Sequence, residues 1–190
     1  MTVVYFVRHA ESDHQNRDEM TRGLSPRGLR DCEPVTRFLS DKDIHAAYSS
    51  PYRRAIETIS DFAKGQGLNI RTLDGFREWH RRGDPTVNFD VFCRRHWEDH
   101  DYRYADGESL CQVQSRNIAA LERILGECKG QNVIVGTHGM ALSTVIHYYD
   151  PRFGYGDFAR LLPLMPMIVK LTFEGMRCVG IEYHAFADGG

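Results

Sequence analysis

Two short motifs in the sequence place a histidine beside groups that bind anions. Arg8 and His9 directly follow the apolar residues 3–7, and His138 and Gly139 come shortly after the apolar residues 133–135. The guanidinium group of arginine is a planar fork of N–H donors that matches phosphate or carboxylate oxygens. Histidine can act as a nucleophile at neutral pH, and glycine lets a ligand approach the backbone closely. These residue types indicate an anion site, with a solvent-facing strand end as the simple alternative.

A third motif, Ser-Pro-Tyr-Arg-Arg at residues 50–54, begins where another predicted strand, 44–48, ends. Carboxyl ends of parallel strands lie on one edge of a sheet, where α/β proteins bind ligands, so the three motifs are expected to converge. The helix predicted after His138 would add backbone N–H donors and the positive end of its dipole. Two histidines and two or three arginines would then meet, a cluster that suits a dianionic phosphoryl group and its transfer.

Transfer of a phosphoryl group from an ester also requires a proton for the leaving oxygen. A carboxylic acid is the usual donor, because nearby negative charge raises its pKa. Glu78 is the leading candidate, since it opens the segment beyond the third predicted strand, and Glu11 is its rival. The structural alternatives are a surface ion pair of Glu78 with Arg77 or Arg81, and a Glu11 that holds a loop or an arginine.

Hydrophobic patterning predicts a chain in which strands alternate with helices. Residues 2–7 form a run typical of a strand buried on both faces. Ser25 and Pro26 suit the N-cap and first position of a helix, which Pro34 should kink or divide. The other predicted elements are strand 44–48, helix 53–63, strand 68–73, helix 110–125, strand 132–137, helix 140–149, a loop at 150–156 and a strand hairpin at 167–173 and 178–183. This alternation predicts an α/β fold, a three-layer α/β/α sandwich with a mostly parallel sheet, as a single domain over residues 1–190.

Residues 75–106 do not fit this alternation. The segment is dense in charged and aromatic residues, holds both tryptophans and has poor periodicity. We predict a lid-like excursion over the sheet edge rather than a core layer. Its arginines are candidates for the distal part of a substrate, with a solvated surface as an equal alternative: Arg81, Arg82, Arg94 and Arg95. Four histidines are expected to be polar surface or lid residues, because their spacing matches no metal site: His14, His80, His96 and His100.

Composition limits the partners and the compartment. The formal net charge is -2, which gives no reason to expect nucleic acid or an anionic membrane as a partner. The five cysteines are odd in number and form no CxxC pair, so neither a disulfide framework nor a metal site is expected, and no cofactor is implied. A cytoplasmic location is predicted, because this cysteine usage fits a reducing compartment and the first strand, at residue 2, leaves no room for a signal peptide. No apolar run approaches the length of a membrane span.

In their order along the chain, the motifs resemble those of the histidine phosphatase superfamily, also called phosphoglycerate mutase-like. The resemblance extends over residues 3 to about 148. The matching elements are Val7 to Ser12 for the RHG/RHA signature, Leu24 to Gly28 for PLTxxG, Ser49 to Thr58 for SSPxxRAxxT, Arg77-Glu78 for the LxE acid, Gly107 to Leu110 for GES, and Thr137 to Gly139 for the second histidine. The RHA triplet alone is a weak signal, whereas the ordered set is highly specific. The chain is most similar to the small broad-specificity phosphatases of the family.

The resemblance implies roles for individual residues. These are His9 as the nucleophile that becomes phosphohistidine, Glu78 as the general acid, and Arg8, Arg54, His138 and Gly139 around the phosphate. Arg54 is preferred over Arg53 because the family arginine directly precedes an alanine, here Ala55. The family often has an asparagine six residues after the nucleophile. Gln15 stands there in this chain with Asn16 beside it, so either side chain is a candidate phosphate donor.

These observations predict an enzyme that hydrolyses small phosphomonoesters, with a phosphorylated metabolite as its partner. A phosphoglycerate-type mutase remains open, although the excursion is short for enclosing a diphosphorylated intermediate. A phosphohistidine-protein phosphatase is a third hypothesis. The presence of Glu78 argues against it, because such enzymes usually lack the acid element. A phosphate-binding regulatory module without turnover is the non-enzymatic alternative. The apolar stretch 161–173 can be core or interface, which leaves a homodimer open.

Overall fold

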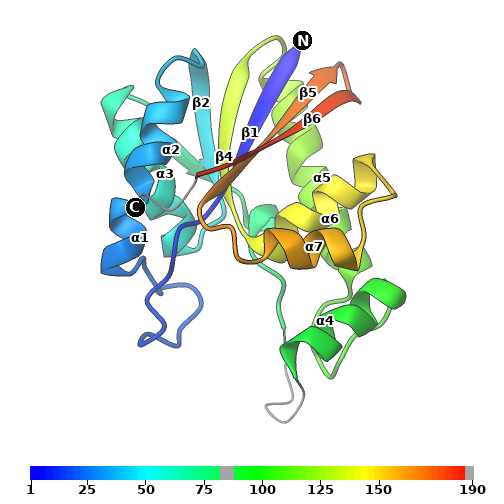
Figure 1. Ribbon diagram of the computed structural model, residues 1–190. Helices are drawn as coiled ribbons and strands as arrows, with labels where there is room; N and C mark the ends of the chain where they lie inside the picture. The colour runs from blue at the N-terminus through cyan, green and yellow to red at the C-terminus, as the bar shows by residue number, and fades with distance from the viewer. Residues whose placement is uncertain (82–87, 187–190) are drawn as a thin grey trace.

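The computed structural model describes residues 1–81 and 88–186 of the chain, built around a six-stranded sheet (Figure 1). The strands are β1 (Thr2–Arg8), β2 (Ile44–Ser49), β3 (Ile70–Thr72), β4 (Asn132–Thr137), β5 (Met167–Glu174) and β6 (Arg177–Ala185). Their order is β3-β2-β4-β1-β5-β6. The first four strands in this order pair in parallel, whereas β5 pairs antiparallel with both β1 and β6. The predicted mostly parallel sheet and its C-terminal hairpin are confirmed.

Helices lie on both sides of the sheet, as predicted for a three-layer sandwich (Figure 1). On one side are α1 (Pro26–Arg30), α2 (Cys32–Leu39) and α3 (Arg53–Gly65). On the other side are α5 (Leu110–Glu127), α6 (Gly139–Tyr149) and α7 (Tyr155–Leu161). A single 3-10 turn, η1 (Asp74–Phe76), and the helix α4 (Phe89–Glu98) belong to the segment that departs from the strand–helix alternation.

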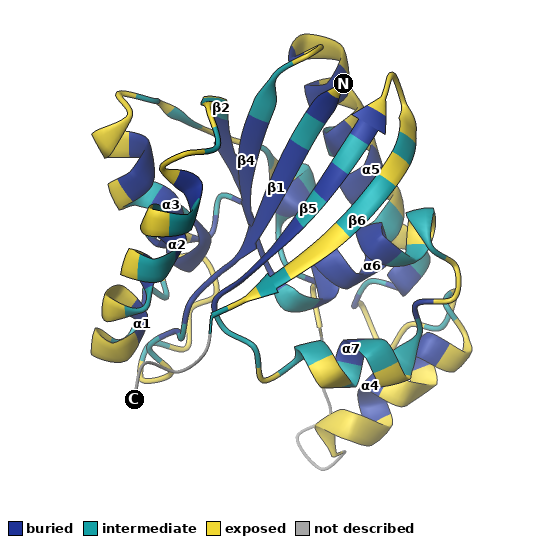
Figure 2. Cartoon of the chain, turned by 45° about the horizontal axis from the view of Figure 1, so that its top comes forward, coloured by how far each residue is buried: buried dark blue, intermediate teal, exposed yellow. Residues whose placement is uncertain are grey.

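The centre of the sheet is buried on both faces, as the apolar run at the start of the chain predicts, whereas the edge strand β6 is exposed or half-buried (Figure 2). Val4 and Phe6 of β1 belong to a core shared with α5 and α6. Tyr5 and Val7, whose side chains alternate with theirs, belong to a second core shared with α2 and α3. The central strand is therefore held from both sides, and its carboxyl end is a fixed point in the molecule.

Local sequence signals explain where the helices begin. The Ser25 hydroxyl accepts a hydrogen bond from the Gly28 N–H at 3.0 Å, with Pro26 as the first residue of α1. The predicted division of this helix falls at Asp31, and Pro34 sits in the first turn of α2, where its missing N–H costs nothing. The start of α5 carries a reciprocal capping box between Ser109 and Gln112.

Residues 75–106 contribute more to the core than the sequence predicts. Phe76, Trp79, Phe92 and Trp97 are buried in the same cluster as β1 and α5. The prediction of an excursion without a core layer is wrong for these side chains. The cause is α4, whose aromatic face packs inward while its charged residues point outward, a pattern that the surrounding loops obscure in the sequence. Residues 82–87, which include Arg82, lie outside the described residues.

His96 of α4 is fully buried, which corrects its prediction as a surface or lid residue. Its Nδ1 atom is 2.8 Å from the Phe92 carbonyl oxygen one turn earlier. The imidazole ring lies edge-on to Trp79 and Tyr102, with centroids at 4.6 and 4.7 Å. A histidine can be accommodated in this aromatic environment because its ring packs like an aromatic side chain while one nitrogen bonds to the backbone.

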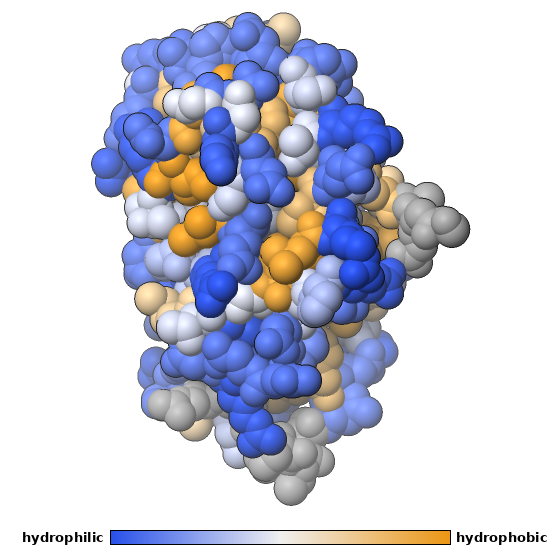
Figure 3. All heavy atoms as spheres, turned by 90° about the vertical axis from the view of Figure 1, so that its left-hand side faces the viewer, coloured by the Kyte–Doolittle hydropathy of each residue, from blue (hydrophilic) through white to orange (hydrophobic). Residues whose placement is uncertain are grey.

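The C-terminal part also departs from the prediction. The helix α7 begins at Tyr155, within the segment expected to be a loop. The strand predicted at 167–173 is present as β5 and lies in the core. Figure 3 shows the face on the side of α1 to α3, which is mostly hydrophilic with a few hydrophobic patches. Of the helices in the described parts of the chain, none has the length and apolar character needed to traverse a bilayer.

Candidate active site

Strand register places the two motif histidines side by side. The parallel strands β1 and β4 pair Arg8 with Thr137, so the next residue of each chain segment, His9 and His138, leaves the sheet at the same level. The His9 N–H donates to the Thr137 carbonyl oxygen at 3.0 Å. The two imidazole rings meet edge to face with centroids 5.2 Å apart. The carboxyl edge of the sheet therefore brings these two motifs together.

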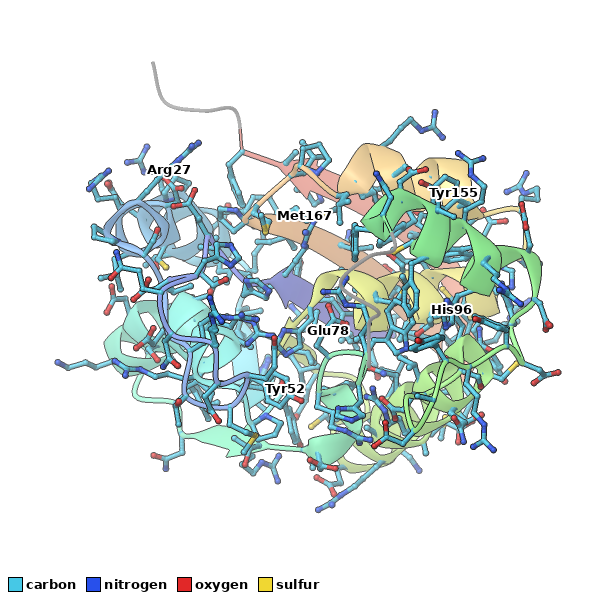
Figure 4. The ribbon with its side chains drawn as sticks, turned by 90° about the horizontal axis from the view of Figure 1, so that it is seen from below. Arg27, Tyr52, Glu78, His96, Tyr155 and Met167 are labelled. Atoms are coloured by element: carbon cyan, nitrogen blue, oxygen red, sulfur yellow. The ribbon has the colours of Figure 1, made fainter. Side chains whose placement is uncertain are left out.

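A pocket of about 420 Å³ opens at this edge. Five of the residues predicted for the site line it: Arg8, His9, Arg54, Glu78 and Gly139. Figure 4 views the molecule from this edge and shows Glu78 near the middle. Tyr52 lies toward α3, and His96 lies in α4. Tyr52 lines the pocket as well, although the sequence motif gave it no role.

The His9 ring has one nitrogen engaged by the backbone and the other directed at an arginine. Its Nδ1 atom lies 2.7 Å from the Ala10 carbonyl oxygen, a contact that requires the proton to be on Nδ1. The Nε2 atom then carries a lone pair, which accepts from Arg54 Nε at 3.3 Å. This tautomer leaves Nε2 as the nucleophilic nitrogen of the ring.

Both histidines are held in the neutral form. Burial keeps the pKa of His9 well below its usual value of 6.5, and the positive charge of Arg54 lowers it further. Burial also keeps the pKa of His138 well below 6.5, with the neighbouring His9 and Arg54 adding to the effect. A neutral His9 is the form that can attack an electrophile at neutral pH.

His138 does not line the pocket but supports it from behind. Its side chain is fully buried, with the ring packed against His9 and against Tyr52 at a centroid distance of 5.1 Å. The Nε2 atom is 2.7 Å from the Ser50 hydroxyl, which also accepts the Tyr52 N–H at 3.2 Å. The Nδ1 atom is buried and has no hydrogen-bond partner within residues 1–81 and 88–186.

The two arginine side chains are both buried but are engaged differently. Arg54, in the first turn of α3, donates through its Nη atoms to the carboxylate and the carbonyl oxygen of Glu19, each at 2.8 Å. Burial lowers the pKa of Arg54, and the charge of Glu19 opposes that shift. Arg53, the alternative weighed from the sequence, has a 64% exposed side chain that pairs with Glu57.

Arg8 uses its outer nitrogens to hold the end of α7. Nη1 donates to the carbonyl oxygens of Leu161 and Leu164 at 2.7 and 3.2 Å, and Nη2 donates to that of Leu162 at 2.9 Å. Nε is buried with no hydrogen-bond partner in the described parts of the chain. A Cβ atom on Gly139 would lie 3.3 Å from this Nε, which places the donor at the start of α6. Burial lowers the pKa of Arg8 to about 10, so the group stays charged at neutral pH.

Glu78 lies over the first turn of α6. Its Oε1 accepts from the N–H groups of Trp79 and Ala141 at 2.8 and 3.0 Å, and its Oε2 accepts from the Met140 N–H at 3.2 Å. A carboxyl group at a helix N-terminus is favourably placed relative to the helix dipole. The rival acid, Glu11, is directed away from the pocket, with Oε1 accepting from the Ser25 hydroxyl at 2.6 Å.

Gln15 and Asn16 are not among the residues that line the pocket. Gln15 is exposed, and its backbone N–H donates to Asp13. The Asn16 amide nitrogen donates to the Thr21 hydroxyl at 3.3 Å. Their predicted contact with phosphate therefore stays a prediction. Ser12, which ends the first motif but was assigned no role, does line the pocket. Glu19 and Arg22 of the following loop line it as well, and they lie outside every motif.

The outer wall of the pocket combines basic and apolar groups. His14, His80 and Arg81 line it on the polar side, and Arg81 lies over the Phe89 ring at 4.9 Å. Phe158, Leu162 and Met165 line it from α7 and the residues after it, a stretch for which no element is predicted from the sequence. Arg94 and Arg95 are elsewhere, over the rings of Tyr155 and Tyr102. Within the described residues, no group of three or more acidic, histidine or cysteine side chains is arranged to hold a metal ion.

Comparison with known proteins identifies the family. The family model described as "Histidine phosphatase superfamily (branch 1)" matches residues 4–179. The chain is 27% identical over 150 residues to phosphoserine phosphatase 1 of Hydrogenobacter thermophilus, covering 73% of this chain and 71% of that protein. The family model matches nearly the whole chain. This chain belongs to the histidine phosphatase superfamily, as its motifs indicate.

Solved structures share the fold at low sequence identity. YhfR of Bacillus stearothermophilus is similar with a TM-score of 0.76 and 22% identity, covering 100% of this chain and 97% of that one. A phosphoserine phosphatase mutant of Entamoeba histolytica in complex with phosphoserine has a TM-score of 0.74 at 17% identity, covering 95% and 96%. Mycobacterial glucosyl-3-phosphoglycerate phosphatase has a TM-score of 0.76 at 18% identity, covering 97% and 99%.

Proposed function

We propose that this protein is a phosphatase that hydrolyses small phosphomonoesters through a phosphohistidine intermediate on His9. The observation that carries the proposal is the state of His9: a buried, neutral ring whose Nε2 lone pair faces the pocket beside Arg54. A further donor, Arg8 Nε, is buried without a partner in the described residues and belongs to a side chain that lines the pocket. Such groups are costly unless something completes their hydrogen bonds, and phosphate oxygens would do so.

In the first step, His9 Nε2 attacks the phosphorus atom as the bond to the leaving oxygen breaks. The N–P bond forms, and Glu78 gives its proton to the leaving oxygen, so an alcohol departs. We assign this proton to Glu78 Oε2, because that oxygen accepts only one N–H, at 3.2 Å. Arg8 and Arg54 would neutralise charge on the oxygens of the transferring group, which is the main catalytic requirement of phosphoryl transfer.

In the second step, water attacks the phosphorus of phospho-His9 and the N–P bond breaks. Glu78, now a carboxylate, takes the proton from the water, and inorganic phosphate leaves. The cycle returns His9 to the neutral form and Glu78 to the protonated form, so protons balance over the two steps. The same carboxyl group serves as acid and then as base, as microscopic reversibility allows.

A small phosphorylated metabolite is the substrate class we propose. The names of two relatives, a phosphoserine phosphatase and a glucosyl-3-phosphoglycerate phosphatase, support hydrolysis of small phosphoesters. The pocket volume of about 420 Å³ is compatible with a ligand of that size. A cytoplasmic location is part of the proposal and is supported by five free cysteines. A homodimer stays a prediction.

The first test is hydrolysis of p-nitrophenyl phosphate in excess EDTA by the wild type and by His9→Ala. We expect metal-independent turnover in the wild type and a loss of at least about a thousandfold in the variant, equivalent to roughly 4 kcal/mol of barrier. Near-normal turnover by His9→Ala would rule out the covalent mechanism. A wild type that binds phosphate without turnover would instead identify a binding module, and interconversion of phosphoglycerate isomers would identify a mutase.

The role of Glu78 is tested with two esters that differ in their leaving groups. p-Nitrophenolate leaves without a proton, whereas an alkoxide requires one. Glu78→Gln should therefore reduce kcat/KM for an alkyl phosphate by at least about tenfold more than for p-nitrophenyl phosphate. Equal losses on the two esters would remove Glu78 as the acid while leaving the role of His9 intact.

A further inference from the structure

A half-buried ion pair lies next to the segment that carries Glu78. Glu108 precedes α5 and Arg116 lies two turns into it, and each side chain is 14% exposed. Arg116 Nε and Nη2 donate to the two carboxylate oxygens of Glu108 at 2.8 and 2.9 Å, which is a bidentate pairing. Glu108 belongs to the GES motif, to which the proposed chemistry assigns no role.

Arg116 binds the backbone on both sides of Glu78. Its Nη1 donates to the carbonyl oxygens of Gly75 and Arg77 at 2.8 and 2.7 Å. Its Nη2 donates to the carbonyl oxygen of Glu78 itself at 3.2 Å. A single guanidinium group therefore fixes three carbonyl groups within four residues of chain.

Glu108 binds the donors of the same segment. Its Oε2 accepts the His80 N–H at 2.9 Å, and its Oε1 accepts from Arg77 Nη2 at 2.7 Å. The backbone contributes as well, since the Glu108 carbonyl oxygen accepts from the Trp79 indole at 2.8 Å. The charges of Arg116 and Arg77 help to keep the pKa of Glu108 below its usual value, despite its burial.

This network replaces regular secondary structure. The segment leaves η1 at Phe76, and no helix or strand of the described chain includes residues 77–81. Packing against α5 is close, because a Cβ atom on Gly75 would lie 2.7 Å from the Arg116 carbonyl oxygen. Neither Glu108 nor Arg116 lines the pocket, so any effect on the reaction must pass through the segment they hold.

We propose that Glu108 and Arg116 form a positioning clamp that holds Glu78 in place to protonate the leaving group. The inference rests on the proposed function, because it assigns the clamp to the acid of that reaction. The clamp binds both the acceptors and the donors of residues 75–80, so the Glu78 backbone cannot shift without breaking several of these hydrogen bonds. Displacement of a proton donor by about 1 Å can cost about a hundredfold in rate.

The test uses Arg116→Lys, which keeps the charge but cannot reach all of these acceptors. We expect kcat/KM for the alkyl phosphate to fall about tenfold more than for p-nitrophenyl phosphate, the same selectivity as in Glu78→Gln. Arg123→Lys is the matched control. Arg123 lies on the same helix and pairs with Glu127 through a 62% exposed side chain, so both esters should be hydrolysed at the wild-type rate.

A double variant separates a positioning role from general damage. If the clamp acts through Glu78, then adding Arg116→Lys to Glu78→Gln should produce no further loss with the alkyl phosphate. Fully additive losses, or equal losses on the two esters by Arg116→Lys alone, would overturn the clamp. If Arg116→Lys does not fold by circular dichroism, Glu108→Gln is measured under the same criteria, because it keeps the shape of the side chain.

The outcome also separates the two proposals. Selective loss in Glu78→Gln without selective loss in the clamp variants would reject the clamp alone. Absence of selective loss in Glu78→Gln would reject the acid assignment, and the clamp with it, while the His9→Ala result would stand on its own.

Discussion

The two walls of the pocket are built by different means. The floor consists of Arg8, His9 and Arg54, with His138 packed behind His9, and these residues come from strand ends and the first turn of a helix. The roof consists of residues 75–80 together with α4 and α7. Backbone pairing positions the floor, as in the register that sets Arg8 of β1 level with Thr137 of β4. Side-chain hydrogen bonds from Arg116 and Glu108 position the roof.

The two walls are expected to contact different parts of the substrate. In the proposed mechanism, groups of the floor bind the phosphoryl group, which every phosphomonoester shares. Groups of the roof then face the leaving group, which differs between substrates. We therefore expect changes in the floor to affect all esters alike, whereas changes in the roof should depend on the ester.

Among changes away from the reacting groups, the largest expected effect comes from moving the floor apart with Gly136→Ala. A Cβ atom there would lie 2.7 Å from the Ala55 carbonyl oxygen, so α3, which carries Arg54, must shift away from β4, which leads into His138. Overpacking of this kind costs about 1–3 kcal/mol of unfolding free energy or more. Activity should fall by about a hundredfold on both esters. Urea unfolding and kcat/KM for the two esters are the measurements.

Gly126→Ala is the matched control for this substitution. No atom lies within 4 Å of the Cβ position at Gly126 in α5, and alanine favours the helix by about 0.5–1 kcal/mol over glycine. Stability should rise slightly and activity should not change. A Gly136→Ala protein with a selective loss on the alkyl phosphate would contradict the division between floor and roof.

The two walls also differ in how well the sequence predicts them. The floor is predictable because a buried strand followed by Arg-His, or by Thr-His-Gly, fixes where those side chains emerge. The register between the parallel strands β1 and β4 then sets the two motifs at the same level. Arg54 is distinguished from Arg53 by its place before Ala55, and the structure buries the former and exposes the latter.

The roof is less predictable because its order comes from contacts distant in sequence. The three carbonyl groups that accept from Arg116 are about 40 residues away from it along the chain. No local sequence pattern predicts such a contact. The burial of His96 depends on Trp79 and Tyr102 in the same way. Glu19 and Arg22 were missed for a related reason, since a polar loop gives no periodicity from which to infer direction.

The next effect in size concerns the pH dependence of stability. The pKa values of His9 and His138 lie well below 6.5 in the folded protein and return to about 6.5 on unfolding. Below pH 6.5 the unfolded state thus binds more protons, so the unfolding free energy should decrease as the pH falls. Each histidine contributes at most about 1.4 kcal/mol per pH unit to this slope.

Urea unfolding between about pH 7 and pH 5 measures this slope in the wild type and in His138→Gln. The variant should lose stability overall but show a flatter dependence on pH, because one titrating group is absent. His96→Phe provides the comparison with the roof, since burial also lowers the pKa of His96. An unchanged slope in His138→Gln would show that the floor histidine is not held neutral.

The smallest expected effect concerns a carboxylate that occupies the floor. Glu19 accepts from Arg54 Nη2 at 2.8 Å and from Arg22 at 2.6 Å, and its side chain is 54% exposed. A phosphate that binds Arg54 must compete with this carboxylate and lie near its charge. Glu19→Gln removes the charge and keeps the shape, so inorganic phosphate should bind about fivefold more tightly, equivalent to about 1 kcal/mol.

The measurement for Glu19→Gln is the inhibition constant of inorganic phosphate against p-nitrophenyl phosphate in EDTA. Glu33→Gln is the control, because Glu33 forms a similar ion pair with Arg37 on the exposed surface of α2. Phosphate that binds the Glu19 variant more weakly would mean that Glu19 orients Arg54 rather than competing for it. The loop from Asp13 to Arg22 would then belong to the floor, positioned by a side chain as the roof is.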